Sequence, residues 1–462
     1  MRIENDGLGN IEVPEGAYWG AHTQRALKNF PITREKFDEE FIRAYGYVKK
    51  ATASLNGKLG FLTEEKCEAI CKACDELIAG QLSDWIVVDP LSGGAGTSIN
   101  MNINEVIANR ATELLGGKKG EYLVHPLDDV NMHQSTNDTF PTAGKMAVIV
   151  LLKELVVAVE KLQEALQIKE KEFWSIMKPG RTQLMDAVPI SLGQEFGAMA
   201  EAISRDRWRL YKVEERVRMV NLGGTAIGTG VAADRKYVLS IVNELRNISG
   251  IRIAKAENLI DATQNMDVFA EIHGLLKALA TNLLKISNDI RLLGSGPNSA
   301  IGELKLPQVQ AGSSIMPGKV NPVVPEYVIQ MSMSVMAHDV AVNFAVSSGN
   351  LELNAFVPLI IHYTLKSLRF LTNAAMSLKE YIVKLQANNE KSRENLLKSE
   401  AVFTPMITAY GYERVQRWIK KSREEGKDIW EIAAEETGLK IDELKQKLLG
   451  KKSMGLGQSE KG

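Results

Sequence analysis

The chain has 462 residues, enough for about three domains of roughly 150 residues each, so it can bury a large apolar core. Its 56 lysine and arginine residues nearly balance 57 aspartate and glutamate residues, which leaves a net charge of -1. A chain without excess charge has no electrostatic attraction for nucleic acid or an anionic membrane, so neither is expected as a partner. A small-molecule ligand fits this composition better.

The N-terminus, MRIENDGLGN, has no apolar stretch after a basic cluster. The most hydrophobic run, 147–159, is interrupted by Lys153 and Glu154, so it is not expected to span a membrane. We therefore predict a cytoplasmic protein. The only strand-like stretch that the pattern indicates is RIENDGLGNIEVP, near the start of the chain.

The cysteines Cys67, Cys71 and Cys74 have the C-x3-C-x2-C spacing with which some enzymes hold an iron–sulfur cluster. The same spacing puts their side chains on one helical face, and Thr63 before two glutamates is typical of a helix N-cap. No glycines flank the cysteines to form a cluster-binding loop. We therefore interpret them as small buried apolar residues of a helix, and no metal or cofactor is expected.

The middle of the chain has apolar residues in steps of three and four, the period of a helix with one buried face. The longest run extends from Phe269 to Leu293, about seven turns. Another run, at 148–166, follows Pro141. The further expected helices lie at 203–220, 324–347 and 358–389. Helices well above the average of about 12 residues predict a mainly α fold with a long five-helix bundle, through which the chain oligomerises.

Three domains are predicted. They are a mostly helical N-terminal domain at 1–137, a central helix bundle at 138–392 and a small helical C-terminal domain at 393–462. The C-terminal domain is distinguished by its higher charge density and its short amphipathic helices. Its last residues, 451–462, are expected to be a loose tail.

Four polar segments interrupt the helical pattern, and each adjoins a predicted helix. They are SGGAGTSINMNINEV (92–106), VNMHQSTNDTFPT (130–142), PGRTQLMDAVP (179–189) and AGSSIMPGKVNP (311–322). Backbone amides, hydroxyls and helix N-termini accept negative charge without a metal, so a small dicarboxylate is the expected ligand. Each segment alone is also what caps and turns require, so this hypothesis depends on the whole set.

The segment 311–322, called the signature loop below, resembles the signature of the aspartase/fumarase superfamily. The resemblance covers nearly the whole chain and includes NMNINEVIANRATELLG, QSTNDTFPTA, GRTQLMDAVPISLGQEF and GGTAIGTG. Within the superfamily, GGAGTS (93–98) and NPVVPE (321–326) resemble aspartases, and RTQ (181–183) resembles some aspartases, where fumarases and other aspartases have RTH. GNLELNAF and HPLDDVN are similar to fumarases.

The resemblance to aspartases implies an anti β-elimination of ammonia from L-aspartate that gives fumarate. It implies that Ser313 is the general base and that Lys319 is the catalytic cation. An unperturbed serine is a very weak base, so its alkoxide must be stabilised by loop amides, by Lys319 or by a helix end. The resemblance also implies that Gly312 and Gly318 let the signature loop open for substrate and then close.

The resemblance implies roles for the other polar side chains. The groups expected to hold the β-carboxylate and the enediolate formed from it are Thr97, Ser135, Thr136 and Ser314. Those expected to hold the α-carboxylate are Lys319, Asn321 and Thr182. The amino group that leaves would contact Asn137, Thr182 and Gln183.

Two alternatives remain open, a class II fumarase and a non-catalytic structural relative. Gln183 stands where fumarases carry a histidine, and glutamine cannot titrate near neutrality, so hydration of fumarate should be poor if it needs that imidazole. The superfamily builds its sites at the corners of a homotetramer, from segments of three subunits. The resemblance therefore implies a homotetramer with a shared helical core.

Overall fold

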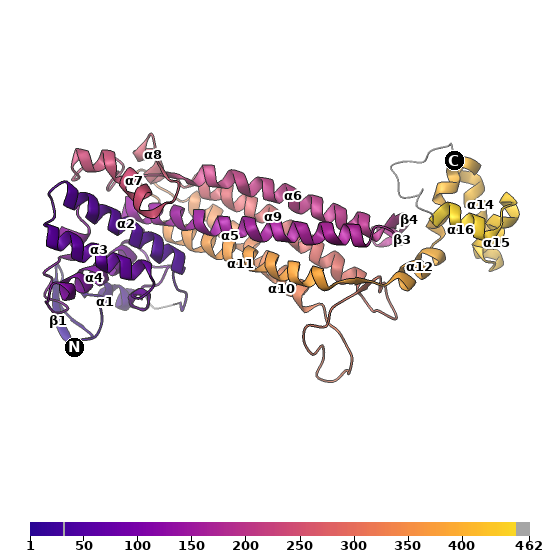
Figure 1. The fold of residues 1–462 in the computed structure, drawn as a ribbon, viewed down its shortest axis with the longest axis horizontal. Coiled ribbons are helices and arrows are strands. Elements are labelled where there is room, and N and C mark those ends of the chain that lie inside the picture. The colour runs from indigo at the N-terminus through magenta and orange to yellow at the C-terminus, as the bar shows by residue number, and fades with distance from the viewer. Residues whose placement is uncertain (31–32, 450–462) are drawn as a thin grey trace. The chain divides into compact units, whose positions relative to one another are not determined.

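The computed structural model describes residues 1–30 and 33–449 (Figure 1). The fold is mainly helical, as predicted. Contacts divide the chain into two compact units: unit 1 holds Met1–Val157, Asp206–Ala280 and Met331–Asn373, and unit 2 holds Ala158–Arg205, Thr281–Gln330 and the described residues from Ala374 onward. The three domain boundaries proposed above stay a prediction, and the expected tail at 451–462 lies outside the described residues.

Five long helices of the described chain contribute segments to both units. They are α5 (Thr136–Glu172), α6 (Leu192–Val217), α9 (Asp267–Leu293), α10 (Val323–Val346) and α11 (Val357–Lys384). The helices predicted from apolar periodicity are therefore confirmed. No helix of the described part of the chain is both long enough and apolar enough to cross a lipid bilayer.

Helix α5 begins earlier than the pattern predicted, because it includes Pro141 in its second turn. Proline has no N–H, so the carbonyl four residues before it, that of Asn137, lacks its helical donor. The side chain of Asn221 supplies the missing hydrogen bond, from Nδ2 to the Asn137 carbonyl oxygen at 3.0 Å. A tertiary contact thus allows the helix to begin before the proline.

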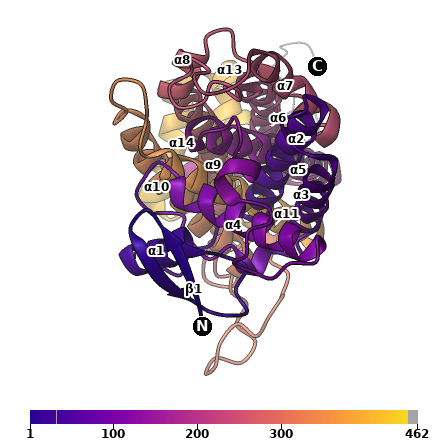
Figure 2. The same ribbon diagram turned by 90° about the vertical axis from the view of Figure 1, so that its left-hand side faces the viewer.

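Unit 1 also contains strands and helices from the N-terminal part of the chain and from the region after α6. Its remaining elements are β1 (Arg2–Asp6), β2 (Gly9–Val13), α1 (Ala21–Asn29), α2 (Glu39–Lys58), α3 (Glu64–Ile78), a 3-10 turn (Ser83–Trp85), α4 (Thr97–Leu114), a π-helical turn (Pro126–Val130), β5 (Met219–Val220), α7 (Arg235–Ser249), β6 (Ala254–Lys255) and α8 (Leu259–Gln264). Strands β1 and β2 pair in an antiparallel hairpin within the N-terminal stretch that was predicted to be strand-like, and β5 pairs with β6 in parallel. Helix α3 packs against both α2 and α4 (Figure 2).

An aromatic cluster joins α2 to the first turns of α5. Phe41 and Phe140 are fully buried, and their ring centroids lie 5.0 Å apart. Tyr45 packs against both rings, and its hydroxyl makes a hydrogen bond of 2.9 Å with Thr139 Oγ1. This packing fixes the start of α5, where one of the four polar segments lies.

The cysteines lie on α3, whose N-cap is Thr63 as predicted. Cys74 is buried, whereas Cys67 and Cys71 are half-buried. Burial raises the pKa of Cys71 to about 12, so its thiol stays protonated at neutral pH. The three sulfurs are not part of any group of metal-ligating side chains within the described residues. Their position on one helical face agrees with the structural interpretation.

Unit 2 contains a hairpin and the C-terminal helices. Its elements are β3 (Met177–Thr182), β4 (Met185–Ser191), β7 (Leu304–Lys305), β8 (Gln386–Ala387), α12 (Asn389–Lys398), a 3-10 helix (Glu400–Met406), α13 (Ile407–Tyr410), α14 (Tyr412–Glu425), α15 (Ile429–Thr437) and α16 (Ile441–Leu449). The helices α14 to α16 (Figure 1) share a core around Phe403, Trp418 and Trp430.

The β3–β4 hairpin corrects the expectation that only the N-terminus forms strands. Its strands contain Pro179, Gly180 and Pro189, residues that usually interrupt a sheet, and a bulge lies at the first two. Its two-residue turn, Gln183 and Leu184, carries none of the Asn-Gly or Asp-Gly pairs that announce a tight hairpin. The pattern therefore indicated a loop where the chain forms a sheet.

We predict that buried His273 makes the stability of the protein sensitive to acid. This residue of α9 is 0% exposed, and burial lowers its pKa to about 4, although Asp339 acts in the opposite direction. An unfolded histidine binds a proton near pH 6.5, so between about pH 6.5 and 4 the unfolded state binds more protons and stability falls as the pH falls. Between pH 7.5 and 5 the expected loss is about 2 kcal/mol.

Denaturation midpoints at these two pH values test the prediction. His273→Leu should lose less stability than the wild type on acidification. An equal loss in the two proteins would show that His273 does not carry the acid sensitivity.

Candidate active site

The segment Ser135–Asp138 in unit 1 is held by a buried carboxylate. Asp138 is 0% exposed, and its two oxygens accept hydrogen bonds of 3.0 Å from the backbone N–H groups of Ser135, Gly223 and Thr225. Burial raises the pKa of Asp138 to about 6, while these amides act in the opposite direction. One side chain therefore ties the start of α5 to the glycine-rich segment near 223, which is distant in sequence.

Asn137 has a fixed orientation in this segment. Its Nδ2 donates to the carbonyl oxygen of Ala226 at 2.7 Å, and its backbone N–H donates to Ser135 Oγ at 3.2 Å. Within the described residues, its Oδ1 has no hydrogen-bond partner. The side chain can therefore present an acceptor to a ligand that carries N–H or O–H groups.

Thr97 begins α4 in the same unit. Gly96 precedes it with φ of 90°, and a Cβ at this glycine would lie only 2.5 Å from the ring of Phe140. The close approach requires glycine, and it places the turn before Thr97 against the first turns of α5. Thr97 Oγ1 donates to the Gly94 carbonyl oxygen at 2.8 Å. The unpaired N–H groups at this helix end are suited to an anion.

A buried lysine, which the sequence pattern did not single out, supports these segments. Lys49 of α2 is 0% exposed, and its Nζ donates to Asn100 at 2.8 Å, Gln134 at 2.9 Å and Asn131 at 3.2 Å. Burial lowers its pKa to about 7. The sequence indicates its burial only through its position four residues after Tyr45, which places it on the helix face that packs against the core. Lys49 thus links α2 to the residues that directly precede Ser135.

Thr182 and Gln183 lie at the tip of the β3–β4 hairpin in unit 2, and both are exposed. Gln183 has a φ of 55° and Leu184 a φ of 64°, so both turn residues adopt the left-handed conformation. Arg181, at the end of β3, donates to both carboxylate oxygens of Glu303. The tip therefore projects from a base that is held by an ion pair.

The signature loop, also in unit 2, places two amide donors on a serine hydroxyl. Ser313 Oγ accepts hydrogen bonds from the backbone N–H groups of Ile315 at 3.2 Å and Met316 at 2.9 Å. Such donors stabilise negative charge on an oxygen, so this arrangement can stabilise a serine alkoxide. Ser314 is exposed beside it.

The base of the signature loop is closed on itself. Asn321 Nδ2 donates to the carbonyl oxygen of Gly312. A Cβ at Gly312 would lie 1.7 Å from the Lys319 carbonyl oxygen, so no other residue fits there. Gly318 has a φ of 78°, which also favours glycine. In this structure Gly312 is thus required for a close backbone contact.

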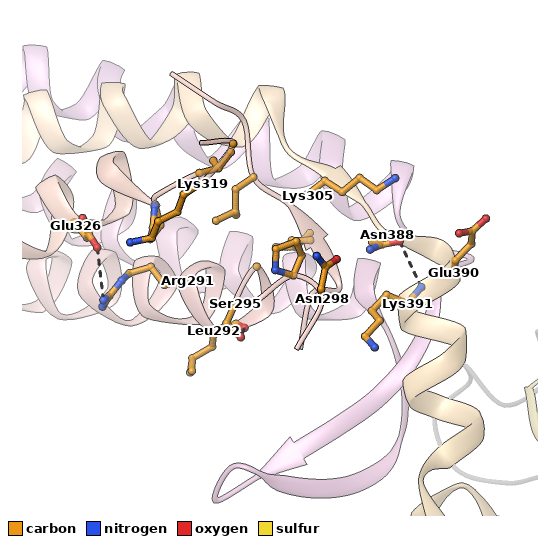
Figure 3. A pocket seen from close by; sticks show the side chains of 18 of the residues that line it. Arg291, Leu292, Ser295, Asn298, Lys305, Lys319, Glu326, Asn388, Glu390 and Lys391 are labelled. Atoms are coloured by element: carbon orange, nitrogen blue, oxygen red, sulfur yellow. Dashed lines mark hydrogen bonds and ion pairs between the residues drawn. The ribbon is translucent and has the colours of Figure 1, made fainter. Parts of the chain in front are cut away.

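Lys319 lines an open cavity of about 1450 Å³ in unit 2 (Figure 3). Arg291 in its wall is paired with Glu326 at 3.8 Å. Lys319 and Lys305 have no ion pair within the described residues. Glu390 also lines the cavity without an ion pair in the described part of the chain, so two free ammonium groups face one free carboxylate, a balance that favours an anionic ligand.

The predicted site residues are divided between the two units. Unit 1 holds Thr97, Ser135, Thr136 and Asn137, and unit 2 holds Thr182, Gln183, Ser313, Ser314, Lys319 and Asn321. Each unit brings hydroxyl, amide or ammonium groups to loops and helix ends. The roles of these residues in one reaction stay a prediction.

Residues 9–337 match a family model described as Lyase. The chain therefore belongs to this family of lyases, within the aspartase/fumarase superfamily, as its motifs predicted.

The similar proteins include two kinds of enzyme. An aspartate ammonia-lyase from Bacillus sp. is 43% identical over 434 residues, which cover 94% of this chain and 93% of that protein. A class II fumarate hydratase from Helicobacter pylori strain J99 is 41% identical over 458 residues, 98% of this chain and 99% of that protein. The solved structure of a fumarate lyase:delta crystallin from Brucella melitensis bound to cobalt has a TM-score of 0.91 and 44% identity, covering 97% of this chain and 98% of that one.

Proposed function

We propose that this protein is an aspartate ammonia-lyase, a carbon–nitrogen lyase that eliminates ammonia from L-aspartate to give fumarate. The observation that carries the proposal is the Ser313 hydroxyl, which accepts hydrogen bonds from two loop amides. Similarity to an aspartate ammonia-lyase over 94% of the chain supports the choice of reaction. The reaction as proposed needs no metal and no organic cofactor.

Ser313 acts as the general base. It takes a proton from the carbon next to the β-carboxylate of L-aspartate, and the electrons move into that carboxylate as an enediolate. The alkoxide that Ser313 needs is stabilised by the N–H groups of Ile315 and Met316 and by the charge of Lys319 in the same loop. Closure of the loop over the substrate excludes water and strengthens these interactions.

The enediolate carries two negative charges, so donors must meet the charge as it develops. Hydroxyl groups and helix ends stabilise the enediolate that forms from the β-carboxylate. Lys319 and Asn321 bind the α-carboxylate. The hydroxyl donors proposed for the β-carboxylate are Thr97, Ser135, Thr136 and Ser314. Thr182 helps to hold the α-carboxylate.

The amino group leaves from the face opposite to the base. Asn137 presents its Oδ1 to the ammonium, because Nδ2 is occupied by the Ala226 carbonyl. Gln183 and Thr182 at the hairpin tip provide further polar contacts. An acceptor fixed in this way favours a substrate with a fully protonated amino group.

A class II fumarase is the alternative, since a class II fumarate hydratase is 41% identical over 98% of this chain. Gln183 argues against it, because a glutamine cannot carry a proton to or from water near neutral pH. A non-catalytic relative is opposed by the presence of Ser313, Lys319 and Asn321 together in the signature loop.

We further propose that the protein works as a homotetramer in the cytoplasm, with each site shared between subunits. A stripe on α10 supports self-association. Its exposed residues are Met333, Ala337, Val340 and Phe344, with Phe344 71% exposed. Their spacing puts them on one helical face, and such an apolar face is suited to a second copy of the chain.

Incubation of the purified full-length protein with L-aspartate tests the reaction. Fumarate should appear by its ultraviolet absorbance, with ammonia released in equal amount, and fumarate with ammonia should give L-aspartate. A folded preparation that releases no ammonia from L-aspartate would overturn the proposal.

A further inference from the structure

The β3–β4 hairpin carries strain at its tip. The turn residues Gln183 and Leu184 have φ values of 55° and 64°, a conformation in which side chains other than those of Asn, Asp and Gly are disfavoured. The Leu184 side chain is 69% exposed, so packing does not hold it there. Strained turns persist only when the surrounding structure determines them, and such turns gather at functional sites.

Arg181, two residues before the first turn residue, forms an ion pair with the buried carboxylate of Glu303. Arg181 Nη1 and Nη2 donate to the two carboxylate oxygens of Glu303 at 2.9 and 2.7 Å. Glu303 is 0% exposed, and it also accepts a hydrogen bond from Asn395 Nδ2 at 3.0 Å and faces Lys178 Nζ at 3.4 Å. A two-point contact between planar groups fixes orientation as well as distance.

Glu303 is anchored by its own backbone. Its N–H donates to the Leu293 carbonyl oxygen at 2.8 Å, and its carbonyl accepts from the N–H of Asn388 at 2.8 Å. The next residue, Leu304, begins β7, which pairs with β8. The carboxylate is therefore a fixed point in unit 2, to which Arg181 attaches the end of β3.

We propose that Arg181 and Glu303 form a positioning pair, which holds the strained turn so that Thr182 and Gln183 keep the orientation needed to meet the substrate. This inference rests on the proposed function, because it assigns the hairpin tip to the site of ammonia elimination. Neither member of the pair touches the substrate. Both act through the backbone of the turn.

A merely structural pair can be distinguished from a positioning pair by relieving the strain. Glycine adopts a positive φ without a steric cost, so Leu184→Gly lets the turn keep its shape with less external support. Glu303→Gln keeps the shape of the side chain but removes the charge that binds Arg181. If the pair holds the turn, the glycine should compensate for the loss of the carboxylate.

The experiment compares the wild type, Glu303→Gln, Leu184→Gly and the double variant as full-length proteins. Glu303→Gln is expected to lower kcat/KM for L-aspartate by about 10- to 100-fold, because displaced contacts lose alignment in the transition state. Leu184→Gly alone should stay within about twofold of the wild type, and the double variant should recover about tenfold over Glu303→Gln. A double variant no more active than Glu303→Gln would overturn the proposal.

Hydrogen exchange of the segment 177–191 gives a readout that does not depend on activity. Exchange should be faster in Glu303→Gln than in the wild type. In the double variant it should be slower than in Glu303→Gln. If the wild type does not act on L-aspartate, the proposed function fails, and the exchange rates alone decide the role of the pair.

If Glu303→Gln does not fold, Arg181→Lys is used in its place, because lysine keeps the positive charge but cannot make the two-point contact. If the segment exchanges at the wild-type rate in the variant that lacks the ion pair, the pair does not position the turn.

Discussion

Replacing Ser313 by alanine is expected to lower kcat for L-aspartate by about 10²–10⁴-fold, the usual contribution of a general base. The variant retains the loop amides of Ile315 and Met316, but these then have no oxygen on which to stabilise charge. Because only the hydroxyl is removed, the contacts proposed between the α-carboxylate and Lys319 and Asn321 should be unchanged. The expected signature is therefore a large fall in kcat with a small change in KM.

The measurement is steady-state formation of fumarate, with denaturation midpoints of each variant. Ser313 lies half-exposed on a loop, so its loss should leave the midpoint close to that of the wild type. Val309→Ala is the matched control, since Val309 is 43% exposed and precedes the loop. An alanine variant with unchanged turnover would exclude Ser313 as the base.

Charge placed on the apolar stripe of α10 is expected to abolish both assembly and activity. The double variant Val340→Arg with Phe344→Arg puts two cations on a face that we propose to be buried against a second copy. An unpaired charge buried in this way costs about 3–5 kcal/mol. Both side chains are exposed in the single chain, so its own fold should survive.

Light scattering and activity, measured on the same fractions, test this expectation. The double variant should have a smaller mass than the wild type and no detectable turnover of L-aspartate. Phe344→Leu keeps an apolar contact and should retain both mass and activity. A dissociated variant with full activity would contradict sites that are shared between subunits.

The helical part of the fold could be predicted because periodicity reports burial directly. The run that begins at Phe269 became α9, and the members of the run spaced three and four apart, such as Ile272, Leu276 and Leu283, are buried. The start of α5 could not be predicted, because it depends on Asn221, a side chain distant in sequence that satisfies the carbonyl left free by Pro141. The β3–β4 hairpin was missed for a similar reason, since tertiary contacts hold a turn that its own residues disfavour.

The candidate site shows the same limit. Hydroxyl and amide residues in polar segments could be found from composition and resemblance, because their chemistry is visible in the sequence. The residues that hold these groups in place could not be found from the sequence. The sequence indicates a helix cap at Asp138, but its carboxylate also accepts hydrogen bonds from the amides of Gly223 and Thr225. Lys49 has the sequence pattern of an ordinary charged helix residue, but it is fully buried. Only the folded chain shows that such groups orient the residues beside them.

The proposed function requires that the protein removes ammonia rather than water from its substrate. The most direct test is a side-by-side measurement of kcat/KM for L-aspartate and L-malate, with fumarate formation followed in both reactions on one preparation. We predict rapid conversion of L-aspartate and little or none of L-malate. Rapid conversion of L-malate, with L-aspartate left unchanged, would contradict the proposed ammonia-lyase activity and identify a fumarase.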